Sequence, residues 1–347
     1  MNVKIDRFLN GITQAFMAPR GFLDSPEGLE STRDMLSVGY NCVALVVNQF
    51  QDSVHSNHIL ADNVHTPEDA TVERHVARLH QAGVSVMLKP MVEPLDSIWR
   101  GCISRQKGNI IAETHTDNIT PWFKSYREFI LRYAELAERT NCEILCIGCE
   151  LDGMECHCAE WRETIRQVRK CYSGIVTYNL TMDITTGNED RRWFSDLDLV
   201  GISGYFKAGP KGKTSTLNEM LAGWAPYRNR LEAFSKWIGR PLFFAETGTR
   251  PVVGAAGITG DFADGALVYS EQEQADYYTS MVETLAHEPW FYGIVWWKHD
   301  EHQHRPNYYL SDGHYVGCEP APMMRQRISE WCRAPQPQKN PILPMSE

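Results

Sequence analysis

The sequence lacks long apolar runs and clusters of basic residues. No segment of the 347 residues approaches the ~20 consecutive apolar residues of a membrane-spanning helix. The first residues, MNVKIDRFLNGITQAF, contain no apolar run of signal-peptide length. The net charge is −10 without any Lys- or Arg-rich stretch, and a nucleic acid or an anionic membrane would require a basic surface. We therefore expect no membrane and no nucleic-acid partner, and a ligand that is neutral or cationic.

The chain also lacks the signs of a disulfide framework, although it contains ten cysteines. Without a secretion signal these cysteines are expected to be reduced thiols, which favours a cytoplasmic location. Two groups superficially have metal-ligand spacing: Cys146, Cys149, Cys156, His157 and Cys158, and later His299, His302, His304 and His314. Buried, inert thiols are the simpler interpretation of the first group. A metal-dependent barrel hydrolase would normally have a His-x-His pair after the first strand, and this sequence has none there. We expect no metal and no cofactor.

Apolar segments of strand length recur along the chain and alternate with helix-like segments. Eight are near-continuously apolar, as strands covered on both faces are: GITQAF (11–16), CVALVV (42–47), SVMLKP (85–90), EILCIG (143–148), IVTYNL (175–180), LVGISGY (199–205), LFFAETG (242–248) and GIVWWKH (293–299). Helical patterns lie between them at 26–39, 66–83, 120–140, 159–174, 217–238 and 271–288. This alternation predicts a single (β/α)8 TIM barrel. A doubly wound open sheet is the alternative, but no strand is followed by a Gly-rich phosphate-binding sequence.

No domain boundary and no internal repeat is visible in the sequence. We expect residues 1–335 to form the catalytic barrel and the Pro-rich residues 336–347 to be a loosely held tail. Three strand-to-helix connections are long, at 48–65, 91–119 and 249–270. In a barrel such loops lie at the C-terminal face, where they build the functional site.

Two glutamates directly follow or end apolar strands. Glu150 follows the fourth strand and Glu246 ends the seventh, and in a barrel these strands face one another across the mouth. A facing pair of carboxyl groups about 5–5.5 Å apart suits retaining glycoside hydrolysis, in which one donates a proton and the other attacks the anomeric carbon. Charge repulsion and burial favour the protonated form of one member of such a pair. Helix capping or ion pairing is the alternative role for either glutamate.

The chain resembles glycoside hydrolase family 113, a family of β-mannanases in the large clan of barrel glycosidases. The resemblance covers nearly the whole chain and rests on these segments: VVNQFQDS (46–53), TP (66–67), GVSVMLKP (83–90), WRG (99–101), WFKSY (122–126), CIGCEL (146–151), WRETIRQVRKCYSG (161–174), VTYN (176–179), FFAETG (243–248) and IVWWK (294–298). It implies that Glu150 is the acid/base, that Glu246 is the nucleophile, and that hydrolysis proceeds by retaining double displacement.

The sequence departs from the pattern of this clan next to the acid/base. Many members carry Asn there, and its amide binds the sugar 2-hydroxyl, whereas this chain has Cys149, a poor hydrogen-bond donor. Asn179, in the fifth strand, is a candidate to supply this contact instead. Met91 and Glu93 also stand where the family more often has polar sugar contacts. These departures bear on sugar and linkage preference.

Six further residues are candidates for substrate binding. Trp296 and Trp297 end the eighth strand, where an indole can stack on a sugar, but strand alternation lets only one face inward. Tyr205, the last residue of the sixth strand, could hold the nucleophile carboxylate or could be a packed core residue. The others could contact sugar hydroxyls or line the cleft: Lys89, Trp99 and Arg100. A Schiff-base role is the alternative for the lysine, and loop anchoring for the other two.

These observations predict a cytoplasmic enzyme that cleaves β-mannosidic links in short oligosaccharides without a cofactor. An oligosaccharide substrate is the expected partner. Two alternatives stay open: a β-glycosidase for another sugar or linkage, and a carbohydrate-binding barrel without catalysis. The sequence leaves open the oligomeric state and the choice between endo and exo cleavage.

Overall fold

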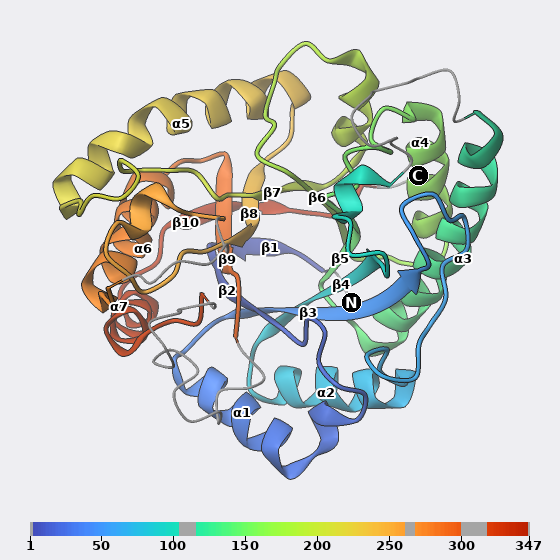
Figure 1. Ribbon diagram of the computed structural model, residues 1–347, viewed down its shortest axis with the longest axis horizontal. Coiled ribbons are helices and arrows are strands. Elements are labelled where there is room, and N and C mark those ends of the chain that lie inside the picture. The colour runs from blue at the N-terminus through green and yellow to red at the C-terminus, as the bar shows by residue number, and fades with distance from the viewer. Residues whose placement is uncertain (1–2, 104–115, 261–267, 300–317, 346–347) are drawn as a thin grey trace.

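Eight parallel strands form a closed barrel at the centre of the protein (Figure 1). This computed structural model describes residues 3–103, 116–260, 268–299 and 318–345. The barrel strands follow one another in chain order: β2 (Leu9–Gln14), β3 (Cys42–Gln51), β4 (Ser85–Pro94), β5 (Ile144–Cys149), β6 (Ile175–Leu180), β7 (Leu199–Ser203), β8 (Leu242–Thr247) and β9 (Phe291–Trp296). The predicted (β/α)8 barrel is confirmed, and the doubly wound open sheet is wrong because β9 pairs with β2 and closes the sheet.

Helices surround the barrel (Figure 1). They are α1 (Pro26–Ser37), α2 (Asp69–Gln81), α3 (Thr116–Thr140), α4 (Cys158–Arg169), α5 (Leu217–Ile238), α6 (Glu271–Leu285) and α7 (Pro322–Arg333), with short 3-10 helices at Phe22–Asp24, Arg100–Cys102, Glu189–Asp196 and Ala255–Gly257. Helix α5 illustrates why the boundaries fall where they do. Thr216 and Glu219 form a capping box at its start, and Gly239 adopts a left-handed conformation (φ 68°) at its end. Within the ranges described above, no helix is both long and apolar enough to cross a bilayer.

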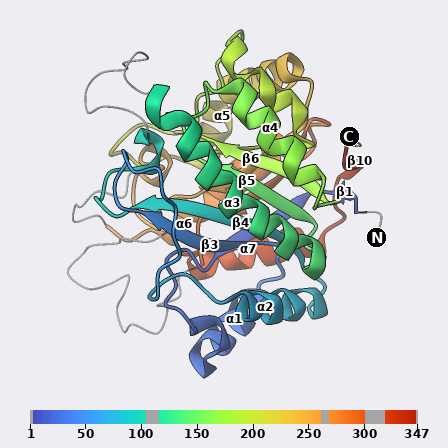
Figure 2. The ribbon, with the colours of Figure 1, turned by 90° about the vertical axis from the view of Figure 1, so that its right-hand side faces the viewer.

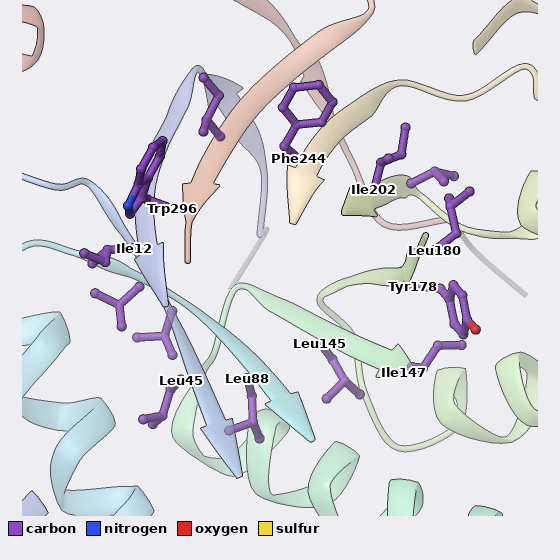
Figure 3. Packing of buried hydrophobic residues seen from close by; sticks show 14 of the residues in the cluster. Ile12, Leu45, Leu88, Leu145, Ile147, Tyr178, Leu180, Ile202, Phe244 and Trp296 are labelled. Atoms are coloured by element: carbon purple, nitrogen blue, oxygen red, sulfur yellow. The ribbon is translucent and has the colours of Figure 1, made fainter. Parts of the chain in front are cut away.

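Two large apolar cores, formed by residues that the structure describes, stabilise the barrel. The outer core lies between strands and helices, and Figure 3 shows its labelled members, from Ile12 through Leu145 to Trp296, arranged around the ring of strands. The inner core fills the barrel with residues such as Leu9, Met87 and Phe243. Each strand therefore buries both faces, which explains the near-continuous apolarity of the strand sequences.

Strands β3 and β4 are longer than their neighbours. Each has ten residues, and they stay paired as far as Gln51 and Pro94. The sequence predicted that these strands end at residues 47 and 90, so it placed four residues of each in loops. Near its end β3 also forms an antiparallel bridge, between Phe50 and Leu60. The extended ends of β3 and β4 form a wall on one side of the barrel mouth.

The end of the chain is held more firmly than the sequence predicted. Residues Gln338–Ile342 form a strand, β10, which pairs antiparallel with β1 (Ile5–Arg7). Figure 2 shows both strands and both termini at one end of the barrel. Ile342 is buried in the inner core, and the ammonium of Lys339 donates to two backbone carbonyl groups after α6. The expectation of a loosely held tail is therefore wrong for residues 338–342, because they close the bottom of the barrel.

Candidate active site

Both predicted glutamates line one cavity at the C-terminal ends of the strands. Glu150 comes directly after β5 and Glu246 lies in β8, across the barrel. The cavity has a volume of about 780 Å³ and is lined by Phe16, Trp99, Arg100, Glu150, Asp152, Thr181, Met182, Ser203, Tyr205, Lys207, Glu246, Thr259, Gly260 and Trp297. This is the volume expected of a small-molecule site, and the two carboxyl groups can therefore reach the same ligand.

Glu246 is buried and held by three side chains. Its Oε1 accepts from the ammonium of Lys89 at 2.5 Å and from the thiol of Cys149 at 3.3 Å, and its Oε2 accepts from the hydroxyl of Tyr205 at 3.2 Å. Burial raises the pKa of Glu246, but the positive charges of Lys89 and Arg100 outweigh it and hold the pKa below its usual value. The carboxylate is thus ionised and fixed in orientation, as a nucleophile must be.

Lys89 and Asn179 lie behind the cavity and do not line it. The ammonium of Lys89 is fully buried, and its three donors face Glu246, Asn179 Oδ1 (2.8 Å) and the Ala245 carbonyl (3.4 Å). The amide nitrogen of Asn179 donates to Leu180 O and to Ser203 Oγ. The prediction that these two residues contact the sugar is therefore wrong in this structure, because protein groups already occupy their polar atoms. Lys89 instead contacts the Glu246 carboxylate, and Asn179 contacts Lys89 and Ser203.

Cys149 remains a neutral donor. Burial, above all, raises the pKa of its thiol well above the usual value, although the Lys89 ammonium opposes this. The thiol packs with Val46 and Met91 beneath Trp297. A protonated thiol can donate to the Glu246 carboxylate, so this residue contributes to the site in a way that the sequence did not indicate.

Glu150 is held by side chains from two other elements. Ser203, the last residue of β7, donates to its Oε1 at 2.6 Å, and the indole of Trp99 donates to its Oε2 at 3.3 Å. A guanidinium nitrogen of Arg100 lies 3.6 Å from the same Oε2, while the other terminal nitrogen pairs with Glu93. Trp99 and Arg100 thus line the cavity as predicted, and their contact with a sugar stays a prediction.

The backbone at Glu150 is strained. Its φ is +52°, in the left-handed region that non-glycine residues rarely adopt. Such a conformation costs of order 1–3 kcal/mol. Its amide donates to Asn179 O at 2.8 Å, and the preceding Gly148 has no space for a Cβ, which would lie 2.5 Å from the ring of Tyr178. Close packing beneath the turn therefore holds Glu150 in the orientation that presents its carboxyl group.

The two tryptophans at the end of β9 face opposite ways. Trp297 lines the cavity and meets the ring of Phe16 edge to face, with centroids 4.8 Å apart. Trp296 is fully buried in the outer core, where its indole donates to Cys318 O at 2.6 Å (Figure 3). The prediction that only one can face inward is confirmed. The prediction that Trp296 binds the substrate is therefore wrong. For Trp297, contact with the substrate stays a prediction.

Several cavity residues were not predicted from the sequence. Ser203 and Asp152 are the most informative, because both are polar residues at the mouth and both lie close to Glu150. Asp152 accepts from the hydroxyl of Thr181 at 3.1 Å through Oδ2. Burial, and then the charges of Glu155 and Glu150, raise the pKa of Asp152 to about 7. Because successive side chains of a strand point to opposite faces, the alternation along β7 could have indicated that Ser203 points inward.

No metal centre is formed by the side chains that the structure describes: no three of their His, Cys, Asp or Glu residues are placed to hold an ion. The predicted cysteine group is divided between the barrel interior, with Cys146 and Cys149, and the surface, with Cys156. His299 is buried between Ser31 Oγ (2.8 Å) and Glu319 Oε1 (3.1 Å). The remaining candidate histidines lie outside the described residues: His302, His304 and His314.

Comparison with known families gives a match over most of the chain. The model of Glycoside Hydrolase Family 113 matches residues 12–318. Among curated proteins, no match is found.

Solved structures of similar proteins agree with this match. The GH113 β-mannanase AaManA from Alicyclobacillus acidocaldarius, in complex with ManMIm, is 26% identical, with 94% of this chain and 97% of that chain covered and a TM-score of 0.77. A structure described as a GH113 β-1,4-mannanase is 28% identical, with 95% and 100% covered and the same TM-score. A GH5_18 protein from Bifidobacterium longum is only 14% identical, with 96% and 81% covered and a TM-score of 0.58, and this likeness shows the fold alone.

Proposed function

This chain belongs to glycoside hydrolase family 113 and is a glycoside hydrolase, and on that premise we propose that it cleaves β-mannosidic linkages of oligosaccharides with retention of configuration. One observation carries the proposal. Glu246 is buried and ionised, three donors hold it, and it shares a cavity with a second carboxyl group, that of Glu150. The names of the solved relatives, which are β-mannanases, support the choice of sugar.

The arrangement supports double displacement in two steps. In the first, the Glu246 carboxylate bonds to the anomeric carbon while the proton of Glu150 passes to the glycosidic oxygen, and the C–O bond to the leaving sugar breaks. In the second, the Glu150 carboxylate takes a proton from water, whose oxygen bonds to the anomeric carbon and releases Glu246. Trp297 offers an apolar face for the sugar in this position.

A panel assay with two variants tests this proposal. Wild-type protein is incubated with β-linked manno-, gluco- and xylo-oligosaccharides, and NMR records the first anomer released. We expect cleavage of the manno-oligosaccharides with the β-anomer first, and a loss of about 10³-fold or more in kcat/KM for Glu150→Gln and Glu246→Gln. Glu232→Gln is the matched control, because Glu232 pairs with Lys236 on α5 and does not line the cavity. An α-anomer released first, or catalytic variants as active as wild type, would contradict the proposal.

A further inference from the structure

Two consecutive residues of β6 hold the backbone on both sides of Glu150. The amide of Glu150 donates to the backbone oxygen of Asn179 at 2.8 Å. The amide of Leu151 donates to the side-chain oxygen of Tyr178 at 3.0 Å. These N–H groups belong to the peptide units directly before and after Glu150, and because peptide units are planar, their orientations determine φ and ψ of this residue. The left-handed conformation of Glu150, with φ +52°, is therefore held from both sides.

Tyr178 acts on this turn from outside the cavity. Its side chain is fully buried and points from β6 into the outer core (Figure 3). The ring packs edge to face against the stacked indoles of Trp161 and Trp193, with centroids 5.2 and 5.1 Å away. Tyr178 does not line the cavity, so its effect on a bound ligand must pass through the turn that carries Glu150.

The directions of the hydrogen bonds at Tyr178 are fixed. A backbone amide can only donate, so the oxygen of Tyr178 accepts from Leu151. Its single hydrogen then goes to Oε1 of Glu155, at 3.0 Å. Burial, and then the charge of Glu155, raise the pKa of Tyr178 well above its usual value, so the hydroxyl keeps this hydrogen. The other oxygen of Glu155 accepts from the guanidinium of Arg191.

Glu155 and Arg191 form a buried ion pair that does not line the cavity. Desolvation makes such a pair weak evidence for stability. The backbone around Glu155 is held as well, because the indoles of Trp193 and Trp161 donate to Glu155 O and Met154 O, both at 2.9 Å. The ion pair thus stands at the fixed end of a hydrogen-bond chain whose other end is the peptide unit next to the acid/base.

We propose that Tyr178 is a positioning residue for the acid/base Glu150, and that Glu155 and Arg191 hold its hydroxyl in place. A strained backbone conformation persists only where its surroundings fix it. Without the bond to Tyr178, the peptide unit after Glu150 turns more freely and the left-handed conformation relaxes. The carboxyl group then loses its place beside the glycosidic oxygen. This inference rests on the proposed double displacement, in which Glu150 is the acid.

Tyr178→Phe tests this role because it removes the hydroxyl and keeps the ring between Trp161 and Trp193. Tyr172→Phe is the matched control. Tyr172 is also buried, and its hydroxyl donates at 2.9 Å to the backbone oxygen of Cys142, just before β5 begins. Both variants lose a buried hydrogen bond between a tyrosine hydroxyl and the backbone, at opposite ends of the same strand.

Glu155→Gln is a second variant that leaves Tyr178 itself unchanged. The guanidinium of Arg191 can only donate, so the oxygen of the new amide must face it. The amide nitrogen then faces Tyr178 and cannot accept its hydrogen. We therefore expect the hydroxyl to be held less firmly and the effect to have the same direction as in Tyr178→Phe, but to be smaller.

The test compares two substrates with the same glycone part and different needs for an acid. Mannotriose has a sugar as leaving group, whereas the leaving group of dinitrophenyl β-mannobioside departs without protonation. We expect kcat/KM for mannotriose to fall about tenfold in Tyr178→Phe and about fivefold in Glu155→Gln. For the dinitrophenyl substrate both variants should stay within about threefold of wild type, and Tyr172→Phe should leave the ratio of the two substrates within about twofold.

The outcomes separate the inference from the function on which it rests. Glu150→Gln defines the ratio of the two kcat/KM values for complete loss of the acid. If wild type cleaves neither substrate, or if Glu150→Gln does not change the ratio, the function and the inference both fail. If Glu150→Gln changes the ratio but Tyr178→Phe lowers both substrates alike, or changes the ratio no more than Tyr172→Phe does, the function stands and the inference is overturned. Glu155→Gln decides the matter by the same comparison if Tyr178→Phe does not fold.

Discussion

The thiol of Cys149 donates to Oε1 of Glu246 at 3.3 Å. The residue directly before one candidate catalytic carboxyl group therefore helps to hold the other, on the opposite side of the barrel. The pairing of β5 with β6 is irregular between Cys146 and Cys149, and Glu150 follows with a positive φ of 52°. Cys149 points to Glu246, and Glu150 lines the cavity. Orientation of the nucleophile and presentation of the acid thus depend on the same short turn.

Substitution of Cys149 measures this contact. Cys149→Ser keeps a donor, and we expect kcat/KM to stay within about threefold of wild type. Cys149→Ala removes a weak hydrogen bond of about 1 kcal/mol, which corresponds to a loss of about fivefold. Steady-state kinetics on an aryl β-mannoside provide the measurement. Equal activity of the alanine and serine variants would mean that the contact does not act on the nucleophile.

Lys89→Met tests the cation that keeps Glu246 ionised. Burial remains in this variant while the neighbouring charge is lost, so the pKa of Glu246 should rise and the acid limb of kcat/KM should move to higher pH. Because the wild-type pKa of Glu246 is lowered on folding, its contribution to stability is present above the unfolded pKa and lost as pH falls. The variant should therefore lose about 3–5 kcal/mol at neutral pH and less in acid.

The matched control for this variant is Lys236→Met. Lys236 forms an exposed ion pair with Glu232 at 2.6 Å, and such pairs contribute little to stability. Urea unfolding at neutral and acidic pH measures the loss of stability, and the pH–rate profile measures the shift of the acid limb of kcat/KM. An unchanged acid limb in Lys89→Met would contradict the role assigned to the ammonium.

Asp152→Asn should change stability in a pH-dependent way. Burial and the neighbouring glutamates raise the pKa of Asp152 from 3.8 to about 7, so the folded protein binds this proton more tightly than the unfolded chain. The wild-type protein therefore loses stability relative to Asp152→Asn as pH rises from about 4 to 7. The full shift corresponds to about 4 kcal/mol, and partial solvent access reduces the expected gain to about 1–2 kcal/mol. Melting temperatures of both proteins at acidic and mildly alkaline pH measure it; a constant difference would contradict the prediction.

Alanine variants of the two tryptophans at the end of β9 should differ, because one residue is predicted to bind the sugar and the other stabilises the fold. Trp297→Ala should lower kcat/KM by about tenfold or more because an apolar sugar contact is lost, with little change in melting temperature. Trp296→Ala leaves a large cavity in the outer core and should cost about 3–5 kcal/mol of stability. Denaturant unfolding and kinetics on the two variants, measured side by side, check this. The reverse pattern would show that the assignment of the two indoles is wrong.

Much of the fold could be predicted from the sequence because its strands are buried on both faces. Continuous apolar runs such as CVALVV mark these strands, and Glu150 and Glu246 stand out at their ends. The strand at Gln338–Ile342 could not be predicted, because its partner β1 lies at the other end of the chain and its sequence is neither apolar nor alternating. Pairing between distant segments leaves no local pattern.

The neighbours of the two glutamates were harder to predict, and the reason is geometric. Lys89 is 157 residues from Glu246, and the sequence shows both but not their contact. The choice between Trp296 and Trp297 depends on irregular register between β8 and β9, which periodicity does not show. Asn179 was assigned to the sugar because the sequence shows a polar residue near a strand end, but not that Lys89 and Ser203 already occupy it.

The central claim is that Glu246 forms a covalent bond to the sugar, and trapping tests it most directly. A fluorinated β-mannosyl fluoride slows the second step, so the glycosyl-enzyme should accumulate, and proteolysis with mass spectrometry locates the added mass. The account predicts one sugar per protein, attached to Glu246, and none in Glu246→Gln. A label on another residue, or rapid turnover without any label, would contradict it.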